Sequence, residues 1–309
     1  MFEFVISRVL RTCLTVAVIV TAVFFATRFS GNAIDFLGGE GLSAKDRQLL
    51  VEYYGLDGSY GEQFVRYIAS LMDGNFGLSL IERRPVAVIF AERVWPSLQL
   101  LIGAVLLTLV VSVPAGIAAA IYRNSWIGNA IMGGAFFGYA IPNFVLAILL
   151  LLIFSFWLGW LPSTGNSTWL HFVMPVTALS TFYIAGMTRF TRNAMLDVLS
   201  QEYLRTARAK GLPERVVIFK HALRNANITI LSVLGLQIAG LAAAGSVVIE
   251  TVFSWRGIGE LLVSAAIRRD YPVLQFGVLA VALAVIVINL LVDLAYGLAD
   301  PRVRLGRNA

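Results

Sequence analysis

Long apolar stretches recur along this chain, separated by shorter polar segments. Six of them approach the length of about 20 residues that a bilayer-spanning helix needs, at roughly 9–28, 97–121, 132–156, 172–188, 228–250 and 273–296. The fourth is short and contains Pro175. The pattern predicts an all-α integral membrane protein with six transmembrane helices.

The composition supports this fold class. Of the 309 residues, 58% are hydrophobic and only 14% are charged. A soluble domain of this length could not shield so much apolar surface from water. The single cysteine, Cys13, lies in the first span and cannot form an internal disulfide. We expect this span to be retained, because the bulky segment FFATRFS is a poor cleavage site.

Basic residues predict the orientation of the spans. Six spans place both termini on one side of the membrane. The termini and the 122–131 and 189–227 loops hold most of the lysines and arginines of the short loops. Short loops rich in these residues face the cytoplasm. We therefore expect both termini and the 189–227 loop on the cytoplasmic side. The net charge of +6 fits basic cytoplasmic loops and is only weak evidence for nucleic-acid binding.

The spans divide the chain into four predicted regions. Residues 1–30 form an N-terminal transmembrane helix, 31–96 an extracytoplasmic loop region, 97–300 a five-helix core and 301–309 a cytoplasmic tail. The loop region contains a predicted helix from Ser43 to Gly55 and a second amphipathic one in GEQFVRYIASLM. Segment 250–272 predicts a short re-entrant or interfacial helix that follows Gly257 and Gly259.

Motifs for catalysis are absent from the sequence. It has no P-loop and no Gly-x-Ser-x-Gly elbow, and its two histidines, His171 and His221, lie far apart without cysteine partners. We expect no catalytic residue, metal site or cofactor in this chain. Asn143, Gln237 and Asn289 are polar residues within spans, and they either line a substrate path or form interhelical hydrogen bonds.

The segment EYLRTARAKGLPERVVIFKHALRN, residues 202–225, is the most basic part of the chain. Gly211 suits a helix C-terminus, and Pro213 suits the first turn of a following helix. These residues predict two short helices joined by a corner. Apolar stripes are expected on both helices: Leu196, Leu199, Tyr203 and Ala207 on the first, and Leu212, Val216, Phe219 and Leu223 on the second.

Three interpretations of this segment compete. Its charges satisfy the positive-inside rule, or a basic amphipathic helix lies on anionic lipid. In the third, the corner docks into a groove on a soluble partner. Residue spacing alone favours the first two.

The segment resembles the cytoplasmic "EAA" loop of permease subunits of ATP-binding-cassette importers. Gly211 stands at the glycine of that pattern, Ala207 at its second alanine and Leu223 at its leucine, although Arg205 and Thr206 replace Glu-Ala. The form EYLRTARAKGL…HALRN is similar to the dipeptide/oligopeptide/nickel permease family, and GNFGLSL, LGWLPSTG, ETVFSW and RRDYPVLQ agree with it. The long loop after the first span resembles the dipeptide-permease B type. Arg256 and Phe276 depart from the family's usual proline and glycine in the outer element.

The resemblance implies a type I importer-permease fold and a bacterial inner-membrane location. It also implies three kinds of partner protein: a second homologous permease, two cytoplasmic ATPase subunits and an extracytoplasmic solute-binding protein. The chain would form half of a pathway for short peptides or related solutes such as glutathione or nickel chelates. The corner would be the coupling helix that contacts one ATPase through Glu202, Tyr203, Arg205, Thr206, Ala207, Lys210, Gly211, Leu212, Pro213 and Arg215.

Two other classes of protein remain as alternatives. A stand-alone secondary transporter would carry ionisable residues near the bilayer midplane or an inverted repeat. An intramembrane enzyme would carry paired acids or a metal set within its spans. The sequence shows neither pattern clearly.

Overall fold

The structure is a computed structural model that describes residues 2–30, 45, 48, 51, 57–241 and 246–299. Side chains are described for all of these residues except 2–9, 228 and 293–299. The predicted Ser43–Gly55 helix is largely, and the 301–309 tail entirely, outside these residues. The chain forms two compact units. One contains residues 1–95 and 257–286, and the other contains residues 96–256 and 287–309.

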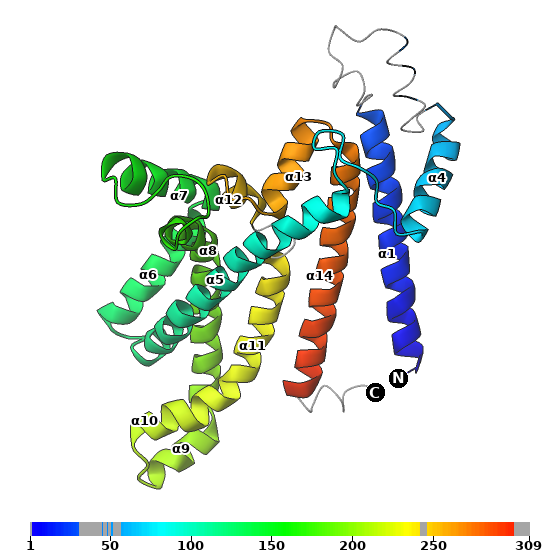
Figure 1. The fold of residues 1–309 in the computed structure, drawn as a ribbon. Coiled ribbons are helices and arrows are strands. Elements are labelled where there is room, and N and C mark those ends of the chain that lie inside the picture. Colours follow the sequence, from blue (N-terminus) through cyan, green and yellow to red (C-terminus); the bar gives the residue numbers. More distant parts are fainter. Residues whose placement is uncertain are drawn as a thin grey trace. The chain divides into compact units, whose positions relative to one another are not determined.

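Four helices in the described part of the chain are long and apolar enough to cross a membrane. They are α1 (Phe2–Phe29), α5 (Val86–Ile121), α8 (Leu170–Leu199) and α14 (Tyr271–Ala299) (Figure 1). Each coincides with a predicted span. Two of them extend well beyond the expected limits, because α5 begins before residue 97 and α8 continues past residue 188. Residues 189–199, assigned to the cytoplasmic loop, therefore belong to α8, and the helix predicted to carry Leu196 to Ala207 is interrupted at Gln201.

The predicted third span is not one straight helix. It consists of α6 (Trp126–Ala140), α7 (Asn143–Leu150) and the π-helix η2 (Leu151–Trp157), and the chain bends by 97° between α6 and the rest. Pro142 explains the bend, because proline disfavours the helical conformation in the residue before it. Ile141 is accordingly extended, with φ −84° and ψ 120°. The straight span at 132–156 is thus corrected to a broken one.

The fifth predicted span, 228–250, is described in two parts. Helix α11 (Leu223–Gly240) provides a shorter apolar segment, Thr229–Gly240, and α12 (Val247–Val252) follows residues 242–245, which are not described. Before α11 the chain is already helical in α10 (Glu214–Val216) and the π-helix η3 (Val217–Ala222).

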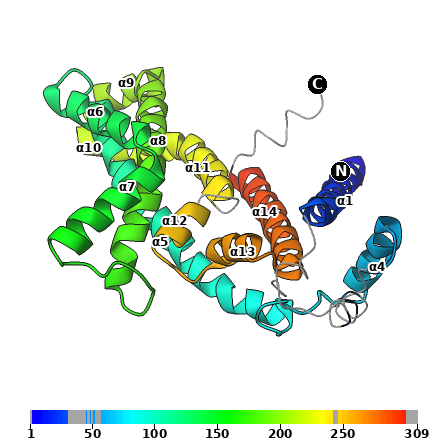
Figure 2. The same cartoon turned by 90° about the horizontal axis from the view of Figure 1, so that it is seen from above.

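Helix α8 is the centre of the second unit and packs against α6, α7 and α11 (Figure 2). Small residues permit this close packing. A Cβ atom on Gly116 of α5 would lie 2.5 Å from Cβ of Thr191 in α8. At Gly138 of α6 it would lie 3.3 Å from Cγ2 of Thr181. Glycines at these positions let the helix backbones approach, as is common in membrane bundles.

Helix α4 (Tyr60–Met72) packs on α1 within the first unit and confirms the amphipathic helix predicted there. Ser59 and Glu62 form a capping box at its start, so two backbone donors of the first turn are satisfied. Aromatic rings join the two helices. Phe24 and Tyr67 stack at 5.4 Å between centroids, and Phe25 and Phe64 at 5.7 Å.

The short helix predicted in segment 250–272 is present as α13 (Ile258–Ile267), capped by Gly257. Asp270 after it is buried and accepts hydrogen bonds from the Ser79 hydroxyl and the Leu80 backbone N–H. Phe276, one of the departures from the family pattern, packs against Phe76 and Phe90, with centroids 4.5 and 5.2 Å away.

Candidate functional site

The candidate site is the elbow, which we define as residues 202–225. It begins with α9 (Glu202–Ala209), turns at Gly211 and returns through α10 and η3 into α11. Figure 1 shows α9 and α10 together where α8 ends and α11 begins. The corner predicted from the sequence is confirmed. The second helix is not short, because it continues without a break into α11.

A Schellman motif fixes the turn. The N–H of Gly211 donates to the carbonyl of Arg208 at 2.9 Å, and the N–H of Leu212 donates to the carbonyl of Ala207 at 3.3 Å. Gly211 has φ +76°, a left-handed conformation that costs other L-residues energy. Pro213 is the N-cap of α10, one residue earlier than the predicted first turn. The corner therefore has one defined backbone shape.

An ion pair that sequence reasoning missed bridges the turn. Arg208 of α9 donates to both carboxylate oxygens of Glu214 in α10, at 3.1 Å from Nε and 2.8 Å from Nη2. The hydrogen bond lowers the pKa of Glu214 and raises the pKa of Arg208. A clue existed in the sequence, since opposite charges flank Gly-x-Pro. We call this pair the clasp.

A second link joins the start of α9 to the start of α11. Nδ2 of Asn225 donates to the Tyr203 hydroxyl at 2.7 Å and to the His221 carbonyl at 3.1 Å. The clasp and this link connect α9 to the returning helix at both of its ends. Such paired connections favour movement of the elbow as one body.

Burial attaches the elbow to the rest of its unit. Leu204 and Ala207 of α9 and Ile218 of η3 are buried in one apolar cluster with side chains of α5, α8 and α11. Leu204 has no exposed surface, and complete burial of a leucine contributes about 1.5–3 kcal/mol. A force applied to α9 would thus be transmitted to several long helices.

The predicted apolar stripes are confirmed in part. Four of their residues belong to the buried cluster or pack against it: Leu196, Leu199, Ala207 and Leu223. Three others are exposed. Tyr203 is exposed while Leu204 is buried, because the extended Gln201 separates α9 from α8. On the second helix Leu212 and Phe219 are exposed, whereas other residues are buried: Val217, Ile218 and Ala222. Leu212 precedes α10 and lies outside the helix. For Phe219 the cause is η3, whose i→i+5 bonding changes the rotation per residue.

Most residues predicted to contact an ATPase lie on the surface of the elbow, and the contact itself stays a prediction. Ala207 is buried, so within this chain it packs in the apolar cluster. The other predicted contact residues are exposed: Glu202, Tyr203, Arg205, Thr206, Lys210, Gly211, Leu212, Pro213 and Arg215. The elbow thus presents a mixed surface of charged, polar and apolar groups around its corner.

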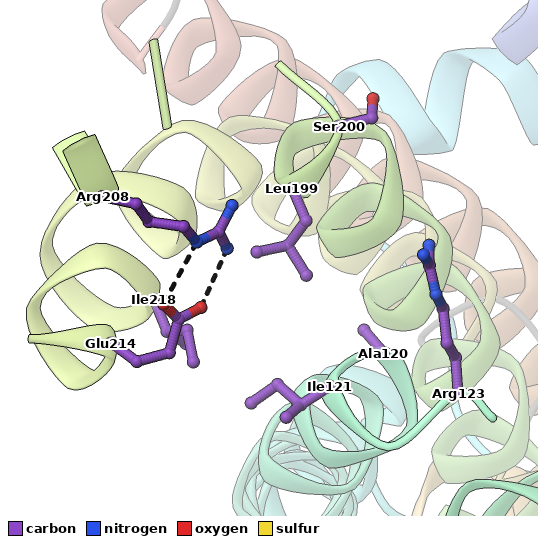
Figure 3. A pocket seen from close by; sticks show the side chains of 8 residues that line it. All are labelled: Ala120, Ile121, Arg123, Leu199, Ser200, Arg208, Glu214 and Ile218. Atoms are coloured by element: carbon purple, nitrogen blue, oxygen red, sulfur yellow. Dashed lines mark hydrogen bonds and ion pairs between the residues drawn. The ribbon is translucent and has the colours of Figure 1, made fainter. Parts of the chain in front are cut away.

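A pocket of about 310 Å³ lies behind the clasp (Figure 3). The figure shows side chains of the elbow, of the end of α8 and of the α5–α6 corner around it. Its lining residues are Ala120, Ile121, Arg123, Leu199, Ser200, Arg208, Glu214 and Ile218. The clasp residues Arg208 and Glu214 form one wall of the pocket, so the shape of the pocket depends on the shape of the corner.

The predicted pathway residues lie on separate helices. Asn143 begins α7 and is half-buried, Gln237 is half-buried in α11, and Asn289 is exposed on α14. Helices α7 and α11 both pack on α8. Oε1 of Gln237 is buried and has no hydrogen-bond partner among the described residues. No hydrogen bond joins these three side chains in the described part of the chain, so their role stays a prediction.

Comparison with known proteins identifies relatives along the whole chain. The family described as "Binding-protein-dependent transport system inner membrane component" matches residues 112–305. Its relatives include the glutathione transport system permease protein GsiC of Escherichia coli strain K12 and of Shigella dysenteriae serotype 1 strain Sd197. Each is 41% identical over 305 residues, which cover 98% of this chain and 99% of the relative.

Solved structures show the same fold at lower identity. An inward-facing structure of the MetNI methionine ABC transporter aligns with TM-score 0.60 and 17% identity, over 70% of this chain and 98% of that one. An amino acid ABC transporter crystallised with histidines aligns with TM-score 0.52 and 17% identity, over 70% and 94% of the two chains.

Proposed function

Because this chain belongs to the binding-protein-dependent inner-membrane permease family, we propose that it forms half of a translocation pathway for short peptides such as glutathione. The family places it in the inner membrane as a multi-pass transport subunit, with ATPase and solute-binding-protein partners. The substrate class rests on the full-length similarity to glutathione permeases.

The elbow carries the mechanistic part of the proposal. Its exposed corner contacts a cytoplasmic ATPase, and closure of that ATPase on ATP displaces the corner. Leu204 and Ile218 transmit the displacement, since they share one buried cluster with α5, α8 and α11. Tilting of those helices then changes which side of the membrane the pathway faces. This assignment implies that both termini are cytoplasmic.

The complete transporter contains a second, homologous permease and two ATPase subunits. A stand-alone chain would leave the elbow's exposed corner without a function. The chain itself needs no cofactor, because nucleotide binds to the ATPase partners.

Purification and uptake test the proposal. A tagged chain isolated in mild detergent should co-purify with a second permease and with P-loop ATPases. Reconstituted vesicles should take up labelled glutathione only with ATP and a loaded binding protein. An unlabelled dipeptide added in excess would measure selectivity among short peptides. Isolation of the chain alone, together with uptake that persists without ATP, would reject the importer assignment in favour of a gradient-driven carrier.

A further inference from the structure

A second pocket, of about 240 Å³, lies in the first unit among α1, α4 and the start of α14. Its lining is mixed: apolar side chains such as Leu71, Phe76 and Phe276 surround polar and basic ones, which include Arg28, Arg66, Tyr67, Ser70, Asn75 and Gln275. The lining residues contain two arginines and no carboxylate. The lining therefore carries two cationic groups, of which Arg66 is paired with Asp57 outside the lining.

Arg28 is the central group of this pocket. It lies in the last turn of a membrane-length helix, and its guanidinium carbon lies 5.2 Å from the ring centroid of Phe24. Nε of Arg28 is buried and has no hydrogen-bond partner among the described residues. Arginine has five N–H donors in a rigid fork, and a buried donor is normally paired. The side chain is thus held in place with hydrogen-bonding capacity to spare.

The walls of the pocket are preformed. The Phe24–Tyr67 stack holds α4 against α1 beside Arg28. Nε2 of Gln275, in α14, donates to the hydroxyl of Thr27 at 2.7 Å, and both side chains are buried. These contacts connect the three helices that surround the pocket, so a ligand would not need to order them.

Arg66 supplies a second cationic group from α4. Its Nη1 lies 3.3 Å from Oδ1 of Asp57, and both side chains are about half exposed. Arg66 lines the pocket while one of its nitrogens is paired with Asp57. Two arginines at one opening suit a phosphate, whose oxygens accept several charge-assisted hydrogen bonds.

We propose that this pocket binds the phosphate headgroup of an anionic phospholipid. Arg28 lies at the end of the apolar segment Leu10–Phe29, the level at which lipid headgroups meet a spanning helix. The pocket is smaller than the 300–1,000 Å³ that small-molecule sites usually occupy. That size suits one phosphate with its nearest carbons, and excludes a whole peptide substrate.

Lipid titration of the intact transporter complex tests this site. Native mass spectrometry would count phosphatidylglycerol molecules that stay bound to delipidated wild-type, Arg28→Gln and Arg66→Gln complexes. Arg28→Gln should weaken retention about tenfold, the effect of losing a charge-assisted hydrogen bond. Arg66→Gln should weaken it less and, as an exposed change, should leave folding intact. Arg268→Gln is the matched control, because Arg268 is exposed and does not line the pocket.

Four results would overturn the proposal. Wild-type retention in both pocket variants would show that the lipid binds elsewhere. An equal loss in Arg268→Gln would show general attraction to positive charge. If phosphatidylcholine is retained as well as phosphatidylglycerol, the pocket has no preference for an anionic lipid. If millimolar inorganic phosphate displaces the lipid, the pocket is a site for soluble anions. None of these results depends on the transported substrate, so failure here is separable from failure of the importer assignment.

Discussion

Replacement of Gly211 tests whether the shape of the elbow matters. Gly211 has φ +76°, and a Cβ atom built there would meet no atom within 4 Å. The cost of adding a Cβ atom is therefore backbone strain rather than collision. For an L-residue that strain is about 1–2 kcal/mol. Gly211→Val should cost at least this much because a β-branched residue is a clear outlier there, while Gly211→Asn should cost less because asparagine tolerates positive φ.

A cost of 1–2 kcal/mol changes a two-state population by roughly 5–30-fold. We expect Gly211→Val to reduce the ATPase stimulation by loaded binding protein by a factor in this range, and Gly211→Asn to retain most of it. The assay is ATP hydrolysis by the reconstituted complex, with and without loaded binding protein. Basal hydrolysis reports on the ATPase subunits themselves.

Gly74 provides a matched control for this experiment. It follows α4, has φ +71°, and also has no atom within 4 Å of a Cβ position. Gly74→Val should therefore introduce similar strain away from the elbow and leave coupling unchanged. Wild-type coupling in Gly211→Val would refute the reasoning. An equal loss in Gly211→Asn would show that the corner needs a bare backbone surface rather than a left-handed residue.

Three further changes have expected outcomes. Gly116→Ala places a Cβ 2.5 Å from Thr191 and should destabilise the complex by about 1–3 kcal/mol through overpacking, measured as a lower melting temperature. Trp255→Ala removes a fully buried ring whose Nε1 donates to a backbone carbonyl, and should cost about 3–5 kcal/mol. Arg208→Gln breaks an exposed ion pair and should cost up to about 1 kcal/mol. Arg208 lowers the pKa of Glu214 from 4.5, so the stabilisation it provides is present above pH 4.5 and disappears as pH falls through the lowered pKa. The difference in melting temperature between wild type and Arg208→Gln should therefore decrease as the pH falls below 4.5.

Each of these changes has its own check. Gly133→Ala is the control for Gly116→Ala and should leave the melting temperature unchanged, because a Cβ atom at Gly133 would meet nothing within 4 Å. Trp255→Phe should retain part of the lost stability through its contact with Phe172. Glu214→Gln should remove the pH dependence attributed to the clasp. If the difference between wild type and Arg208→Gln stays constant down to about pH 3, Glu214 is not its source.

The sequence by itself determined the class of the protein and most of its helices. Local hydropathy was sufficient for α1, α5, α8 and α14, since a span of this length requires only a continuous apolar segment. Gly211 and Pro213 located the corner, because their backbone preferences act within a few residues. The importer-permease fold implied by the quoted motifs is confirmed by the family match and by the solved structures.

Only the tertiary structure decided the bend, the registers and the pairings. Pro142 allowed a kink, but its 97° size depends on how α6 and α7 pack against α8. The buried face of the returning helix followed from η3, since hydropathy analysis assumes the α-helical period. The clasp and the position of Arg28 depend on side chains meeting across turns and between helices. A linear pattern specifies which groups exist, whereas their partners are chosen by packing in three dimensions.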